Sequence, residues 1–150
     1  ANWKMAPPLG SPEDVAAIRA AVKDGTLGIF ATDHAPHPAA KKMAGFRTSA
    51  NGIVGLETAA AITWHVMVRQ EGMSPADWAA RWTAGPAALI HETVDADSFT
   101  VLDLQANKAV DPASFRTKST NQPFTARRFA AWPVLTVLKG KETWNGRDVL

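Results

Sequence analysis

A nearly continuous apolar run, Leu27 to Thr32, places the strongest restriction on what this chain can fold into. Glycine and polar residues bound the run, and Asp33 follows it directly. A short run of this kind suits a strand that is buried on both faces, as in a parallel sheet. The sequence therefore predicts a parallel α/β fold with Asp33 at the carboxyl end of a strand, where active sites of such folds lie.

Residues 12–23 are predicted to form a helix with defined ends. Ser11 is a good N-cap, Pro12 suits the first helical position, and Asp24-Gly25 closes the segment. One face of this helix is expected to be apolar, through Val15, Ile18, Ala21 and Val22.

Three further helices are expected later in the chain. The longest helical pattern covers residues 53–70, Ser74-Pro75 opens another helix, and Thr83 is the expected cap of a short helix over residues 84–90. Because they fall at helical spacing, three tryptophans are predicted to be packing anchors: Trp64, Trp78 and Trp82.

The pattern changes to β after residue 95. Residues 99–104 and 134–138 are strand-like, and residues 139–144 turn back as a hairpin. Residues 1–10 are expected to be a short extended segment, so the order is strand, helix, strand and helix, followed by a small β-rich piece.

Composition excludes several classes of protein. Among 150 residues the formal net charge is only +2 and basic residues do not cluster, which argues against a nucleic-acid-binding stripe. There is no cysteine, which excludes a disulfide scaffold or a thiolate metal site and fits a reducing compartment. No apolar run approaches the length of a membrane span.

The loop after the predicted strand, Asp33-His34-Ala35-Pro36-His37, is the first candidate for chemistry. A carboxylate followed by two imidazoles can bind a metal, move a proton or hold an anionic substrate. The same residues could equally be a turn cap and solvated loop histidines, so this motif alone leaves both interpretations open.

Several motifs occur together in a fixed order. They are Lys4 to Leu9, Asp24-Gly25-Thr26, Ala31 to His37, Gly52 to Thr58, Phe115 to Ser119 and Asn121 to Phe124. In this order and spacing the chain resembles the dihydroorotases of the amidohydrolase superfamily. The resemblance covers essentially the whole chain and implies about the last third of a family member, that is, its C-terminal portion only.

The resemblance implies an α/β fold class. Residues 1–94 would be the C-terminal part of a (β/α)8 metal-dependent hydrolase barrel, and residues 95–150 a small β-rich segment of the flanking β-domain. Asn121 to Phe124 would be structural, and Arg127-Arg128 would lie on the solvated edge of that β-domain.

The resemblance also implies roles for individual residues. Asp33 would be a zinc ligand and the catalytic proton shuttle, and His37 would contact the substrate carboxylate. Asn51 and Gly52 would bind the pyrimidine ring, largely through the backbone. The family's substrate-contacting asparagine is replaced here by Ala6, and a usual arginine by Gly10.

The family's other metal ligands have no counterpart in this sequence. One aspartate cannot hold a catalytic zinc, which normally needs about three protein ligands. His65 and His91 are expected to be packing or surface residues. We therefore expect this stretch alone to be inactive, to bind zinc weakly and to be prone to aggregation.

The leading functional expectation is a zinc-dependent cyclic amidohydrolase that interconverts dihydroorotate and N-carbamoyl-aspartate in cytoplasmic pyrimidine biosynthesis. A non-catalytic scaffold partner of a transcarbamoylase, or a hydantoinase-like enzyme, is the alternative. The expected partner is a small-molecule substrate, and neither nucleic acid nor a membrane is expected to bind. A homo-oligomer and a transcarbamoylase partner are both possible.

Overall fold

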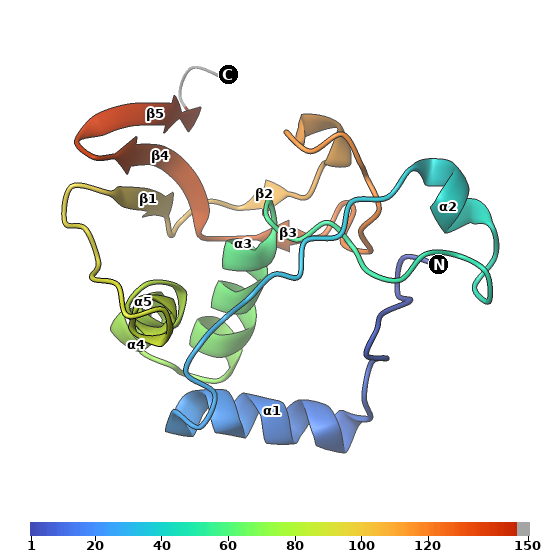
Figure 1. Ribbon diagram of the computed structural model, residues 1–150, viewed down its shortest axis with the longest axis horizontal. Helices are drawn as coiled ribbons and strands as arrows, with labels where there is room; N and C mark the ends of the chain where they lie inside the picture. Colours follow the sequence, from blue (N-terminus) through green and yellow to red (C-terminus); the bar gives the residue numbers. More distant parts are fainter. Residues whose placement is uncertain (147–150) are drawn as a thin grey trace.

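The computed structural model describes residues 1–146 and combines helices with small antiparallel sheets (Figure 1). The helices are α1 (Pro12–Asp24), α2 (Ala39–Met43), α3 (Ala59–Thr63), the π-helix η1 (Trp64–Gln70), α4 (Pro75–Trp82), α5 (Ala84–Leu89) and the 3-10 turn η2 (Pro112–Ser114). The strands are β1 (Phe99–Asp103), β2 (Lys108–Ala109), β3 (Arg128–Phe129), β4 (Trp132–Leu138) and β5 (Lys141–Asn145).

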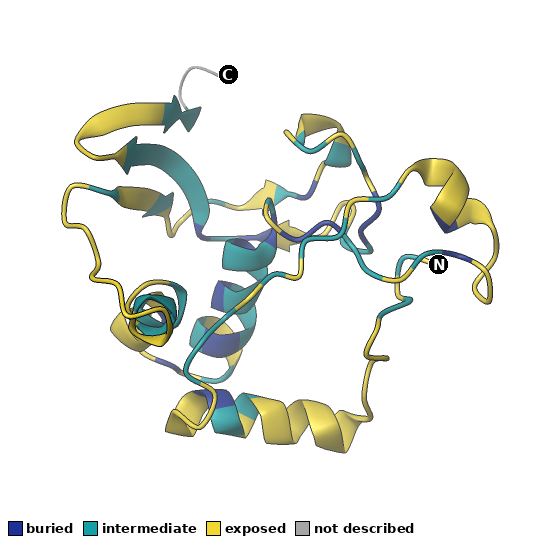
Figure 2. Ribbon diagram, in the orientation of Figure 1, coloured by how far each residue is buried: buried dark blue, intermediate teal, exposed yellow. Residues whose placement is uncertain are grey.

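Helix α1 confirms the expected start and end. The Ser11 hydroxyl accepts from the backbone N–H of Asp14, whose carboxylate accepts from the Ser11 N–H, and Gly25 closes the helix in the left-handed conformation. Such a reciprocal cap satisfies backbone donors that the first turn cannot pair internally. Of the expected apolar face, only Val22 is buried, while Ile18 is 56% exposed (Figure 2).

The helix expected over residues 53–70 begins later, at Ala59. Residues 53–55 are extended because their backbone groups bind other segments: Ile53 accepts from the Ala35 N–H, and Val54 donates to the Asn121 carbonyl. From Trp64 onward the helix winds as η1, and the Glu71 N–H donates to the Val66 carbonyl five residues back.

The main core lies between these helices and confirms the tryptophans as packing anchors. Trp64 and Trp78 are buried with an edge-to-face contact at 5.2 Å between ring centroids, and Trp82 packs on Phe30 at 5.3 Å. The Thr63 hydroxyl accepts from the indole N–H of Trp78 at 3.1 Å and of Trp82 at 3.3 Å.

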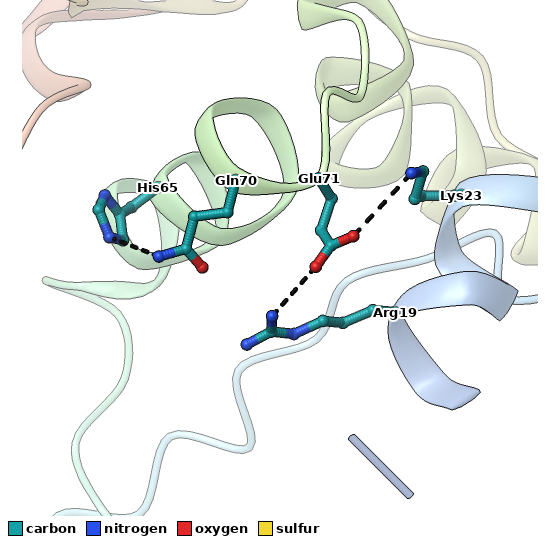
Figure 3. A network of polar contacts seen from close by, with 5 residues as sticks. All are labelled: Arg19, Lys23, His65, Gln70 and Glu71. Atoms are coloured by element: carbon teal, nitrogen blue, oxygen red, sulfur yellow. Dashed lines mark hydrogen bonds and ion pairs between the residues drawn. The ribbon is translucent and has the colours of Figure 1, made fainter. Parts of the chain in front are cut away.

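Glu71, at the end of η1, forms ion pairs with α1 (Figure 3). One carboxylate oxygen lies 3.0 Å from the Arg19 guanidinium, and the other lies 3.9 Å from the Lys23 ammonium. On the same helix, Gln70 hydrogen-bonds the His65 ring at 3.1 Å, a pair that is five residues apart.

The prediction of a strand over residues 27–32 is wrong, because within residues 1–146 this segment forms no strand. The segment is extended but pairs with no strand; Phe30 donates to the Arg81 carbonyl, and Leu27 donates to the Ala21 carbonyl. A strand is defined by a hydrogen-bonded neighbour, and within residues 1–146 all strand pairings are antiparallel ones elsewhere. The expected parallel sheet is therefore not seen there.

The β-rich piece after residue 95 is confirmed. Strands β1, β4 and β5 form an antiparallel sheet in the order β1-β4-β5, and Lys139-Gly140 makes the turn of the expected hairpin. Strands β2 and β3 form a second, two-stranded sheet. This part packs on the helices, because Ala131 belongs to the Trp64 core and Phe129 packs with Ala61.

The short helix α4 also begins as expected, with Ser74 accepting from the Asp77 N–H. Thr83, however, makes no side-chain cap for α5, because its hydroxyl donates back to the Ala79 carbonyl. None of the helices described in residues 1–146 is long and apolar enough to cross a membrane.

Candidate functional site

The loop after Thr32 and the segment around Gly52 lie against each other. The Ala35 N–H donates to the Ile53 carbonyl at 2.8 Å, and the Gly52 N–H donates to the Lys4 carbonyl at 2.9 Å. Three segments that are distant in sequence thus meet here: the first residues, the Asp33–His37 loop and residues 47–55.

Asn121 joins the same three-way contact from a fourth segment. It is 5% exposed, its side-chain oxygen accepts from the His37 N–H at 3.0 Å, and its amide donates to the carbonyls of Ala35 and Gly52. A buried side chain with all these bonds fixes the loops rather than contacting solvent, as the structural interpretation of Asn121 to Phe124 expects.

Asp33 lies at the start of its loop but not at the end of a strand. Its backbone has a φ of 43°, its side chain is exposed, and the carboxylate has no hydrogen-bond or ion-pair partner among residues 1–146. Aspartate is one of the few residues that tolerate this left-handed conformation. The carboxylate is therefore free to take a proton or a cation.

His37 is held directly against Asn51. Its Nε2 atom lies 2.8 Å from the Asn51 carbonyl oxygen, so that Nε2 carries the proton and donates. In the neutral ring, Nδ1 is then an acceptor. Only the imidazolium form has a second N–H to donate to an anion.

Glycine is required at position 52 by the backbone conformation and by the space around it. It has a φ of +94°, and a Cβ built there would lie 2.6 Å from the Cβ of Ala35. Its N–H and carbonyl are already engaged, the carbonyl by Lys42 and Asn121. The free backbone donor of the Asn51-Gly52 pair is therefore the N–H of Asn51, which has no partner in the described chain.

The other residues singled out from sequence lie as follows. Ala6 is exposed, two positions after Lys4, and makes no hydrogen bond in the described residues. The His34 Nδ1 atom accepts from the N–H groups of Gly55 and Leu56 at 3.1 and 3.3 Å, which commits that nitrogen to the loop. Glu57 accepts from the Thr117 N–H at 2.9 Å.

Two histidines lie outside this contact, as expected. His65 packs edge-on against Phe129 with ring centroids 5.4 Å apart, and His91 is exposed. Arg127 and Arg128 are exposed as well, with the Arg128 side chain bound to Asn107.

Sequence reasoning missed two lysines. Lys42 is 6% exposed and donates to the carbonyls of Ala50 and Gly52, both at 2.9 Å, while Lys4 donates to those of Arg47 and Ser49. Burial, and next the nearby positive charge of Lys4, lower the pKa of Lys42. A lysine in a polar loop carries no sequence signal of burial.

The described residues do not by themselves fit a metal ion. In residues 1–146 there is no group of three or more histidine, aspartate or glutamate side chains that could hold one. Asp33 offers one free carboxylate, whereas a catalytic zinc normally has about three protein ligands.

Comparison with known proteins gives a consistent result. No protein-family model matches the chain. The dihydroorotase of Brevibacillus brevis is 39% identical over 93% of the chain, and that of Halalkalibacterium halodurans is 37% identical over 99%. The chain spans about a third of the length of these curated relatives, 34% and 36%.

Solved structures of related enzymes share the fold. The L-hydantoinase of Arthrobacter aurescens superposes with a TM-score of 0.87 at 25% identity, covering 95% of this chain and 34% of that one. The D-hydantoinase of a Thermus species superposes with a TM-score of 0.86 at 17% identity, covering 97% and 34%. Over nearly its whole length, this chain is therefore homologous to dihydroorotases, and its fold is that of the corresponding part of amidohydrolase-superfamily enzymes.

Proposed function

We propose that the protein to which this chain belongs is a zinc-dependent cyclic amide hydrolase that interconverts dihydroorotate and N-carbamoyl-aspartate, in the cytoplasm and in pyrimidine biosynthesis. The observation that carries the proposal is the bond from His37 to the Asn51 carbonyl. It brings together the loop with the free Asp33 carboxylate and the segment with the free Asn51 N–H. The identity to named dihydroorotases over 93% and 99% of the chain supports the choice of substrate.

In this proposal each residue has a distinct role. Asp33 accepts a proton at its carboxylate and returns it to the amide nitrogen that leaves, which is general acid–base catalysis. Asn51 donates its backbone N–H to the pyrimidine ring, while Gly52 permits the close approach of the two loops. His37 binds the substrate carboxylate, and as imidazolium it does so from Nδ1.

Zinc is proposed as the cofactor of the longer protein, with Asp33 as one ligand. When bound, zinc would lower the pKa of a water so that hydroxide forms near neutral pH. One carboxylate alone does not make a zinc site, which normally has about three protein ligands. The division into a barrel part, residues 1–94, and a β-domain part, residues 95–150, also belongs to the proposal, as does the loss of one side-chain contact at Ala6.

The experiment is turnover of dihydroorotate by the full-length, zinc-loaded protein and by its Asp33→Asn variant. Asparagine tolerates the left-handed backbone of Asp33, so this change removes the charge without new strain. We expect kcat to fall by at least about 10²-fold to 10⁴-fold, the usual range for a lost acid–base group. The matched control is Asp97→Asn, at another exposed aspartate whose side chain has no partner in residues 1–146.

Other outcomes separate the alternatives. Hydrolysis of hydantoin or dihydrouracil without dihydroorotate turnover would assign a hydantoinase-like activity. Absence of turnover on all three substrates would favour the scaffold. Normal turnover by Asp33→Asn would contradict the role proposed for the carboxylate.

A further inference from the structure

The segment from Arg47 to Gly52 turns its carbonyl groups toward side-chain donors. Lys4 binds the carbonyls of residues 47 and 49, at 2.9 and 2.7 Å, and Lys42 binds those of residues 50 and 52, each at 2.9 Å. The carbonyl between the two Lys42 acceptors is that of Asn51, which His37 binds at 2.8 Å. The acceptors on both sides of the His37 contact are thus held by one ammonium group.

Lys42 is an unusual residue to find in this place. It is 6% exposed, although lysine is almost never fully buried unless it is paired. No carboxylate within the described residues lies in ion-pair distance of it, so backbone carbonyls alone replace the water that its charge has lost. A neutral apolar side chain would fill the same space without that desolvation, which indicates that the donors themselves are needed.

The backbone bonds of this segment leave one donor free beside the Lys42 contacts. The N–H of Ala50 donates to the Lys41 carbonyl and that of Gly52 to the Lys4 carbonyl. Between them, the N–H of Asn51 is the one without a partner in the described chain. Lys42 binds the carbonyl groups of the residues on both sides of Asn51.

We propose that Lys42 is a positioning residue, which holds Ala50 and Gly52 so that the Asn51 N–H and the His37 ring keep a fixed relation for binding the substrate. The inference rests on the proposed hydrolase function. Lys42 acts through the backbone of residues 50–52 and does not itself touch the substrate.

The test compares three variants of the full-length protein. Lys42→Met removes the donors and keeps the length of the side chain, Lys42→Arg keeps charge and donors, and Lys41→Met is the matched control at the neighbouring exposed lysine. Loss of hydrogen bonds from a charged donor predicts that Lys42→Met raises KM for dihydroorotate about tenfold to a hundredfold. We expect kcat to change less than about threefold, because the affected contact is made equally in ground and transition state. Lys42→Arg should recover most of the loss in KM.

A second measurement does not depend on activity. Amide hydrogen exchange of Ala50 and Gly52 should become at least about tenfold faster in Lys42→Met and stay unchanged in Lys41→Met. If Lys42→Met does not fold, Lys42→Gln takes its place, since a shorter neutral amide cannot hold both carbonyls at the same positions. If the wild-type protein is inactive but the exchange of Ala50 and Gly52 still becomes faster in Lys42→Met, the proposed function is wrong and the positioning role of Lys42 stands. Unchanged exchange, or equal changes in KM for the Lys41 and Lys42 variants, would overturn the positioning role.

Discussion

The ring of His37 donates to the carbonyl of Asn51 across 14 residues of sequence, at 2.8 Å. This bond fixes the tautomer of the ring and ties the Asp33–His37 loop to the Gly52 segment. It also means that His37 has one nitrogen left for a ligand. The bond therefore gives a direct test of the part that His37 has in substrate binding.

Replacing His37 by asparagine should weaken substrate binding more than catalysis. One hydrogen bond to a charged group contributes about 1.5–3 kcal/mol, so we expect KM for dihydroorotate to rise about tenfold or more while kcat changes less. Steady-state kinetics on the full-length protein measures this. The exposed His91, with a φ of 57°, is the control site, because asparagine tolerates its left-handed backbone. A fall in kcat with unchanged KM would contradict a binding role.

Replacing Thr63 by valine should destabilise the helical core. The change keeps the shape of the side chain but leaves the indole N–H groups of Trp78 and Trp82 without their acceptor. A buried donor left unpaired costs about 1–3 kcal/mol, so with two donors affected we expect the free energy of unfolding in urea to fall by about 2–6 kcal/mol. Thr83→Val is the matched control, since that hydroxyl is exposed and binds only the carbonyl one turn back. Equal effects at both positions would show that the indole bonds contribute nothing.

Stability should fall in acid through two aspartates whose carboxylates accept hydrogen bonds within turns, Asp24 and Asp95. The Ser98 hydroxyl and the Asp97 N–H lower the pKa of Asp95 from its ordinary value, and hydrogen bonds from Thr26 lower the pKa of Asp24 in the same way. Since each folded pKa lies below the unfolded one, their contribution is fully present above about pH 4 and is lost as pH falls through the lowered folded values.

Urea unfolding measured between pH 6 and pH 2.5 tests this. The pH dependence should be shallower in Asp24→Asn and Asp95→Asn than in wild type, while Asp97→Asn should leave it unchanged. The same slope in all four proteins would show that Asp24 and Asp95 do not cause the loss of stability in acid.

The 150 residues expressed alone should be inactive, bind zinc weakly and aggregate. Their described part has no group of metal ligands, and large apolar side chains lie exposed, including Ile18 at 56%, Leu56 at 66% and Leu89 at 70%. Calorimetric zinc titration, dye binding and light scattering measure these properties. Ile18→Lys should reduce scattering, and tight stoichiometric zinc binding would contradict the expectation.

Local signals in the sequence predicted much of this fold. The Ser11 cap, the Gly25 end of α1, the start of α4 and the hairpin of β4 and β5 depend on neighbouring residues, so they could be read from the chain directly. The strand expected at residues 27–32 needs a neighbouring strand, which residues 1–146 do not supply, and the first turn of the expected 53–70 helix is replaced by bonds to Ala35 and Asn121.

The candidate site was predicted only in part for the same reason. His37, Asn51 and Gly52 were each expected to contact the substrate, and in the structure His37 binds the carbonyl of Asn51, the residue before Gly52. Lys42 and Asn121 were not expected as parts of it, because their importance comes from burial against segments far away in sequence.

The π-winding of η1 lets this region accept the loss of one residue. Bonds from residue i to i+5 align side chains five apart, which is why His65 meets Gln70, and carry the chain on to Glu71. Because π-winding takes up one residue more than α-winding, deleting one residue between Trp64 and Gln70 would let the segment return to α-winding with Glu71 on nearly the same side of the helix. The Glu71 carboxylate would still face Arg19 and Lys23, whereas the same deletion in an ordinary α-helix would turn it away by about 100°.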